Sequence, residues 1–87
     1  MATYRIEWKK SAVRELRRLD HQVIARVVAV VGLLAADPYP RGVRKLSGTE
    51  NTYRVRVGDY RIVYEVLDRD LLIQIARVRH RKDAYRM

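Results

Sequence analysis

The sequence contains no cysteine, which excludes disulfide bonds and thiolate metal sites. It has no glycine-rich phosphate-binding loop, and its scattered acidic residues argue against a two-metal nuclease. Its longest apolar stretch, residues 27–36, is far shorter than the roughly 20 residues that span a bilayer. No apolar segment of the secretory-signal kind follows its first residues. These absences predict a soluble cytoplasmic protein that works without metal or cofactor.

Length and charge are the most informative global properties. The chain has 87 residues, which favours one domain spanning residues 1–87, because a second domain would lack its own core. Nineteen basic residues against ten acidic ones give a net charge of +9, and fifteen of the nineteen are arginine. Arginine binds phosphate bidentately and stacks on bases, so the excess points to a polyanionic partner, most often nucleic acid. A genome rich in G and C would also favour arginine codons.

Hydrophobic periodicity predicts an α+β fold with the element order β-α-α-β-β-β. Proline at position 38 ends the second helix, and residues 38–51 form a loop rich in turn residues. Short turns between the last three strands predict an antiparallel meander, with the two helices forming a hairpin packed on one face of the antiparallel sheet. The expected elements are a strand at residues 3–8, a helix at 10–19, a helix from Asp20 to about Ala36, and strands at about 52–57, 60–67 and 71–78.

The stretch YRVRVGDYRIVYEV, residues 53–66, alternates apolar and polar residues around a Gly-Asp turn. If Gly58 and Asp59 are the two loop residues, Arg56 lies opposite Arg61, and directly opposed residues share a face. The apolar set then forms the core side, and Arg54 joins the other two arginines on the opposite face. Opposed like charges destabilise a hairpin, so this face indicates a site for an anionic ligand. The alternative is a solvated polar face with Glu65 as a local counter-charge.

The last strand adds further basic residues. Arg77, Arg79 and Arg81 recur with period two and share a face if the strand extends that far, whereas His80 has the opposite parity. Arginine can stabilise a phosphoryl transition state, and a tyrosine or histidine can move protons, without a metal. This set suits in-line attack by the 2′-hydroxyl of RNA on the adjacent phosphorus.

Three segments of the sequence resemble the RelE/ParE toxin superfamily. Residues 53–64, YRVRVGDYRIVY, resemble its signature hairpin, residues 45–48, KLSG, match its K-L-x-G loop, and residues 78–85, VRHRKDAY, resemble its closing V-G-H-R-x-x-x-Y segment. The similarity covers nearly the whole chain. It implies the RelE-like microbial ribonuclease-type fold. The RelE branch implies a toxin of a type II toxin–antitoxin system that enters the ribosomal A site and cuts mRNA through the 2′-hydroxyl, leaving a 2′,3′-cyclic phosphate.

The resemblance also implies roles for particular residues. Arg61 matches the arginine that contacts the scissile phosphate, Arg81 a stabiliser and proposed general acid, and Tyr85 a proposed general base. Arg54 and Arg56 stand where well-studied members carry two lysines; arginine keeps charge stabilisation but is a poor proton donor or acceptor. Proton transfer would then fall to Tyr85 or His80, and Arg79 replaces the usual glycine. The residues expected to bind RNA or the ribosome are Lys45, Arg77, Arg79, His80 and Lys82.

Two other functions remain open on this sequence. One is the ParE branch, which inhibits DNA gyrase without catalysis and usually lacks the arginine–tyrosine set. The other is a catalytically inactive basic module that binds nucleic acid or the ribosome on the same fold. In each toxin branch the expected partner is a cognate antitoxin. A small core and an open basic face favour an acidic, partly disordered segment that wraps the toxin.

Overall fold

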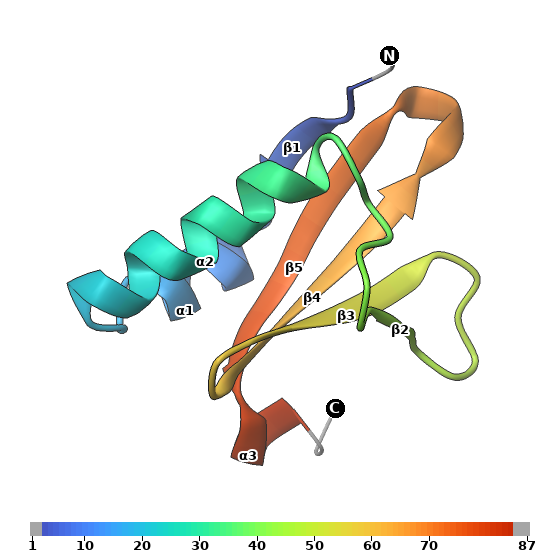
Figure 1. The fold of residues 1–87 in the computed structure, drawn as a ribbon. Coiled ribbons are helices and arrows are strands. Elements are labelled where there is room, and N and C mark those ends of the chain that lie inside the picture. The colour runs from blue at the N-terminus through green and yellow to red at the C-terminus, as the bar shows by residue number, and fades with distance from the viewer. Residues whose placement is uncertain (1–2, 85–87) are drawn as a thin grey trace.

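A computed structural model describes residues 3–84 of the chain (Figure 1). Three helices and five strands follow one another in this part, with a 3₁₀ turn at Asp68–Asp70. No helix in residues 3–84 is long and apolar enough to cross a membrane. The helices are α1 (Lys10–Leu16), α2 (His21–Leu34) and α3 (Arg81–Ala84), and the strands are β1 (Arg5–Trp8), β2 (Arg44–Lys45), β3 (Thr52–Val57), β4 (Tyr60–Leu67) and β5 (Leu72–His80).

The sheet has the strand order β1-β5-β4-β3-β2. The expected α+β class, the order of the main elements and the antiparallel β3-β4-β5 meander are confirmed. The sheet is mixed rather than wholly antiparallel, because β1 pairs parallel with β5 at one edge. At the other edge β2, a two-residue strand that periodicity does not reveal, pairs with β3.

The β3–β4 hairpin has the register expected from its sequence. Val57 lies opposite Tyr60 and Arg56 opposite Arg61, so Gly58 and Asp59 form a two-residue turn. Gly58 has a φ of 57°, a left-handed conformation that glycine adopts without the steric cost of a Cβ. The turn chemistry therefore sets which residues share each face of the hairpin.

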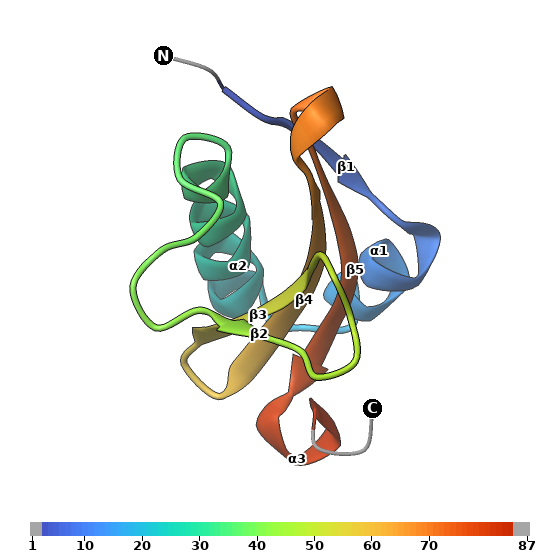
Figure 2. The same ribbon diagram turned by 90° about the vertical axis from the view of Figure 1, so that its right-hand side faces the viewer.

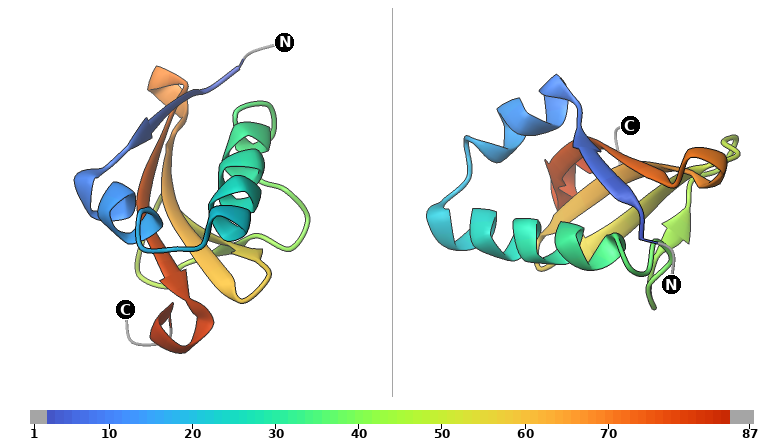
Figure 3. Two further views of the ribbon diagram at one scale, coloured as in Figure 1. Left: turned by 90° about the vertical axis from the view of Figure 1, so that its left-hand side faces the viewer. Right: turned by 90° about the horizontal axis from the view of Figure 1, so that it is seen from above.

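The two long helices do not form the expected hairpin on one face. Helix α2 lies on one side of the sheet and α1 on the other, against β5 (Figures 2 and 3). The hydroxyl of Ser11 donates a hydrogen bond to the carbonyl oxygen of Ala76 at 2.8 Å, and the N–H of Val78 donates to Glu15 Oε1 at 2.9 Å. Helix α1 thus satisfies the backbone of β5 beyond the end of β1, where no strand covers that edge.

The hydrophobic core lies between α2 and the inner face of the sheet. The helix contributes Val27, Val31 and Leu34, which are at most 2% exposed. The sheet contributes the inward-facing residues of its three central strands: Val55, Val57, Ile62, Tyr64, Val66, Ile73, Ile75 and Val78. This is the apolar face expected for the hairpin, so its arginines necessarily lie on the outer face.

A β-bulge at Ala76 reverses which side chains at the end of β5 face the outer side of the sheet. Tyr64 pairs with Ile75, but its neighbour Val63 pairs with Arg77, so one residue of β5 is left over. Because side chains alternate along a strand, the extra residue moves Arg77 to the outer face, although it shares the sequence parity of buried Ile75. The bulge therefore places the arginines of β5 on the same side as those of the hairpin.

A cluster of tyrosines holds the loop after α2 against the sheet. The hydroxyl of Tyr39 donates to both carboxylate oxygens of Asp68, at 3.2 and 3.1 Å, and Tyr4 donates to Oδ1 at 2.6 Å. Tyr64 donates to the carbonyl oxygen of Pro38 at 2.7 Å, and the rings of Tyr39, Tyr53 and Tyr64 pack in sequence. The loop that leads to β2 is thus fixed at its start.

These contacts predict that three tyrosines ionise late. Burial raises the pKa of Tyr39 and Tyr64 well above the ordinary value, and the hydrogen bond from Tyr39 to Asp68 adds to the shift of Tyr39. The separate hydrogen bond from Tyr4 to Asp68 raises the pKa of Tyr4. Above pH 10 the folded chain then holds protons that the unfolded chain has lost, so stability should fall as pH rises. Phenolate absorbance of the folded protein should show Tyr4, Tyr39 and Tyr64 ionising above the ordinary pH range of tyrosine.

The substitution Asp68→Asn separates the two causes of the raised pKa values, which are burial and hydrogen bonding to Asp68. It removes the negative charge beside Tyr4 and Tyr39 but leaves the burial of Tyr64, so their part of the late absorbance change should move to lower pH while that of Tyr64 stays. Completion of the whole tyrosine absorbance change within the ordinary pH range of tyrosine would contradict the prediction.

Candidate functional site

The outer face of the sheet carries a groove of about 800 Å³, referred to below as the arginine groove. It is built from the β3–β4 hairpin and from the loop and short strand that precede it. Its lining residues are Arg41, Gly42, Arg44, Arg54, Val55, Arg56, Gly58 and Arg61. Five of the eight are arginines, and none is acidic.

The hairpin orients two of these guanidinium groups. Nε of Arg56 donates to the carbonyl oxygen of Gly58 at 3.2 Å, and Nη1 of Arg61 donates to the carbonyl oxygens of Tyr60 at 3.2 Å and Gly58 at 3.5 Å. Within residues 3–84, no carboxylate forms an ion pair with Arg41, Arg44, Arg56 or Arg61. Four of the five arginines that line the groove therefore have no carboxylate partner among the described residues.

Two members of the groove were missed by the sequence interpretation. Arg41 and Arg44 lie in a segment whose prolines and glycines indicate only a loop. In the structure Arg44 pairs with Arg54 across β2 and β3, which adds a third strand to the basic face. The available signal was that PRGVRK is itself rich in basic residues, but its position relative to the hairpin depends on tertiary packing.

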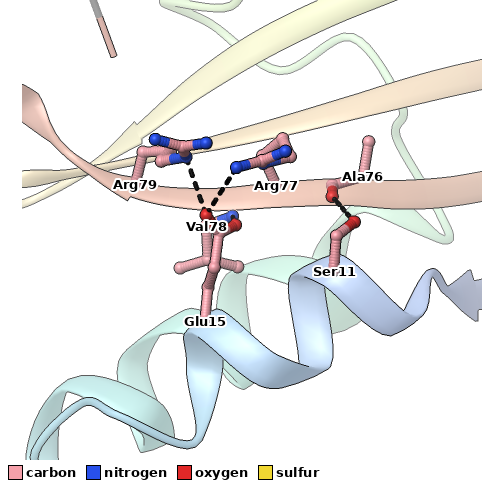
Figure 4. A network of polar contacts seen from close by, with 6 residues as sticks. All are labelled: Ser11, Glu15, Ala76, Arg77, Val78 and Arg79. Atoms are coloured by element: carbon pink, nitrogen blue, oxygen red, sulfur yellow. Dashed lines mark hydrogen bonds and ion pairs between the residues drawn. The ribbon is translucent and has the colours of Figure 1, made fainter. Parts of the chain in front are cut away.

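The arginines of β5 have a different environment (Figure 4). Arg79 pairs with Arg61 across the sheet, so it lies on the outer face as expected. However, Glu15 Oε2 on α1 accepts a hydrogen bond from Nη2 of Arg77 at 3.0 Å and forms an ion pair with Nε of Arg79 at 2.7 Å. The expected second row of open arginines is therefore held by a carboxylate of the protein itself.

Several predicted site residues lie outside the arginine groove. Arg81 begins α3 instead of continuing β5, and its N–H donates to the carbonyl oxygen of Asp59 at 2.7 Å, so it stays close to the hairpin turn. His80 packs edge-on against Tyr60, with ring centroids 5.4 Å apart, and Lys45 pairs with Tyr53, so both have the parity of the opposite face. Lys82 is exposed on α3. Tyr85 lies outside the described residues.

The side chains that line the groove are better suited to binding an anion than to transferring a proton. A guanidinium group donates several hydrogen bonds in a planar fork, which matches the spacing of the non-bridging oxygens of a phosphate. They are poor proton donors or acceptors, so a reaction here needs a proton-transfer group from outside the lining. In residues 3–84 no cluster of three or more His, Asp or Glu side chains could hold a metal ion.

Comparison with known proteins defines the class. The family described as ParE toxin of type II toxin–antitoxin system, parDE, matches residues 6–85. The chain belongs to this family, within the RelE/ParE toxin superfamily that its motifs resemble. It is therefore a member of the toxins of toxin–antitoxin systems.

Individual relatives carry RelE-type names. The chain is 34% identical to Toxin RelG of Mycobacterium tuberculosis over 87 residues, with 95% of this chain and 97% of the relative covered. It is 28% identical to Putative toxin RelE1 of Methanocaldococcus jannaschii, with 95% and 96% covered. The archaeal RelE–RelB complex from Pyrococcus horikoshii contains a chain of the same fold, with a TM-score of 0.82, 36% identity, and 91% and 96% coverage.

Proposed function

We propose that this toxin is a ribosome-dependent endonuclease that cleaves mRNA in the A site and so inhibits translation. The observation that carries the proposal is the arginine groove, in which Arg56 and Arg61 lie opposite each other across the hairpin and no carboxylate of residues 3–84 pairs with them. Five lining arginines match the charge of an RNA backbone, and the rigid sheet keeps their positions fixed before substrate binds. The toxin would act in the cytoplasm, where ribosomes are.

The proposed reaction uses the nucleophile that RNA itself carries. The 2′-hydroxyl attacks the adjacent phosphorus, the bond from phosphorus to the 5′-oxygen breaks, and the products are a 2′,3′-cyclic phosphate and a 5′-hydroxyl. Arg61 binds the scissile phosphate, while Arg54 and Arg56 stabilise the negative charge that develops on its oxygens. Arg81 stands beside the hairpin turn as a further stabiliser. Tyr85 takes the proton from the 2′-hydroxyl, a water molecule protonates the departing 5′-oxygen, and no metal takes part.

Cell-free translation of one defined mRNA tests this function. Purified toxin is added with and without ribosomes, and new RNA ends are mapped by primer extension. We expect ribosome-dependent cuts that disappear in the Arg61→Ala/Arg81→Ala double variant. The matched control is Arg5→Ala/Arg69→Ala, which also removes two arginines, both exposed and outside the arginine groove, and should cleave like the parent. Intact mRNA at every toxin concentration would contradict the proposal.

A second candidate function is inhibition of DNA gyrase, because the matching family is described by the ParE toxin. In that case the arginine groove would be a binding surface without catalysis. A supercoiling assay with purified gyrase distinguishes the two functions. Inhibition of supercoiling together with intact mRNA would establish the gyrase function instead.

We also propose a cognate antitoxin as the partner of this chain. A similar toxin from Pyrococcus horikoshii is described in complex with RelB. The net charge of +9 and the open arginine groove favour an acidic segment that folds on binding. Calorimetry with the acidic protein encoded next to the toxin gene should show tight binding, weakened by salt. The absence of heat with that protein would overturn this part of the proposal.

A further inference from the structure

A second groove, of about 520 Å³, lies along α1 and contains the single tryptophan of the chain. None of its lining residues belongs to the arginine groove. The lining of this Trp8 groove is Trp8, Lys10, Val13, Arg14, Arg17 and Arg18. Four of the six are cations, and the two others are apolar.

The cations of the Trp8 groove follow from the helical repeat. Lys10, Arg14 and Arg17 recur about one turn apart, so they lie on the same side of α1. Ser11 and Glu15 form a different stripe of the helix, which faces β5. The only carboxylate of α1 is therefore directed away from the groove.

This arrangement is unfavourable for the isolated helix. Like charges at i and i+4, such as Lys10 and Arg14, destabilise a helix, and α1 has no acidic residue in its first turn to offset them. Within the described part of the chain, no carboxylate forms an ion pair with Lys10, Arg14, Arg17 or Arg18. The internal structure thus gives no reason for four cations here, whereas an external anion would.

The side chain of Trp8 indicates which class of anionic ligand fits this groove. This side chain is half-buried, because one side packs against the core while the remainder lines the groove. Bases of single-stranded nucleic acid stack on such aromatic rings while adjacent basic side chains bind the phosphates. An acidic peptide would use the cations but leave the indole without a planar partner.

We propose that the Trp8 groove is a second binding site for single-stranded RNA, with one base stacked on Trp8 and phosphates bound by Arg14 and Arg17. The site is separate from the arginine groove and takes no part in cleavage. It adds sequence-tolerant affinity, because every base has a face that can stack. The inference does not depend on the proposed endonuclease activity, since binding here needs neither ribosomes nor a reactive 2′-hydroxyl.

The single tryptophan provides a direct measurement. A 2′-O-methyl RNA of about eight nucleotides lacks the nucleophile, so it can be titrated into the parent toxin without cleavage. Base stacking should quench the fluorescence of Trp8. Arg14→Gln/Arg17→Gln should raise the dissociation constant obtained from this quenching at least tenfold. It should also reduce the slope of log affinity against log salt by about 1.4, since each phosphate contact on a single strand contributes roughly 0.7.

The matched control removes two charges elsewhere. Arg5→Gln/Arg69→Gln changes two exposed arginines outside both grooves and should leave the quenching curve close to that of the parent. RNA binding without any change in Trp8 fluorescence would overturn the proposal, as would equal loss in the two double variants. Polyglutamate serves as the acidic-peptide probe. If it quenches Trp8 and displaces the RNA at equal charge concentration, the groove is a site for an acidic protein segment instead.

Discussion

Replacing Arg61 with alanine is expected to lower the rate of ribosome-dependent cleavage about 100-fold to 1,000-fold. Such a loss is typical when one preorganised donor to a developing oxyanion is removed. Arg61 lies opposite Arg56 in the hairpin and is oriented by the carbonyl oxygens of Tyr60 and Gly58. Because its side chain lies on the outer face and not in the core, the variant should keep its fold.

The comparison of alanine with lysine at this position tests the role of the guanidinium. Arg61→Lys keeps the charge but loses the planar fork, so it should recover only part of the activity. The rate is measured from single-turnover cleavage on programmed ribosomes, with Arg69→Ala as the control of equal charge change. If Arg61→Ala and Arg69→Ala cleave equally fast, Arg61 does not contact the scissile phosphate.

Replacing Glu15 with alanine is expected to lower the free energy of unfolding by about 2–3 kcal/mol. The carboxylate accepts hydrogen bonds from Arg77 and from the N–H of Val78 and forms an ion pair with Arg79, and its side chain is 21% exposed. Its removal leaves two closely spaced arginines without their counter-charge and an edge N–H of β5 without its acceptor. For a chain of this size the loss corresponds to a decrease in Tm of roughly 10 °C or more.

A series of substitutions separates the two parts of this effect. Glu15→Gln keeps an acceptor for the N–H of Val78 but loses the charge. Its free energy of unfolding should therefore lie between that of the parent and that of Glu15→Ala. Glu50→Ala removes an exposed loop carboxylate and should change stability by less than about 0.5 kcal/mol. The measurement is urea unfolding of each variant. Equal stability of Glu15→Ala and Glu50→Ala would show that the network in Figure 4 contributes nothing in solution.

The sequence by itself determined the β3–β4 hairpin and the outer face that it presents. Alternation of apolar and polar residues and a Gly-Asp turn are local signals, and a two-residue turn permits one register. Arg54, Arg56 and Arg61 were therefore assigned to one face correctly. The superfamily motifs also lie in short contiguous segments, and the hairpin motif contains the same three arginines.

Tertiary structure decided the surroundings of that face. The position of α1 depends on hydrogen bonds between Ser11, Glu15 and residues more than 60 positions away, which no local pattern encodes. Arg41 and Arg44 join the groove only because the tyrosine cluster holds the loop after α2 and β2 pairs with β3. In each case the contact is between segments distant in sequence, whose pairing is selected by packing.

The bulge at Ala76 is the clearest example of a feature that hydrophobic periodicity does not predict. Periodicity correctly gives Arg77 and Arg79 a common face, but the same periodicity places them with Ile73 and Ile75, which are buried. One extra residue in β5 reverses the alternation and puts both arginines beside Arg61 and within reach of Glu15. The alternation of side chains is a property of the strand, whereas the residue at which it reverses is set by pairing with β4 and by α1 along the edge of β5.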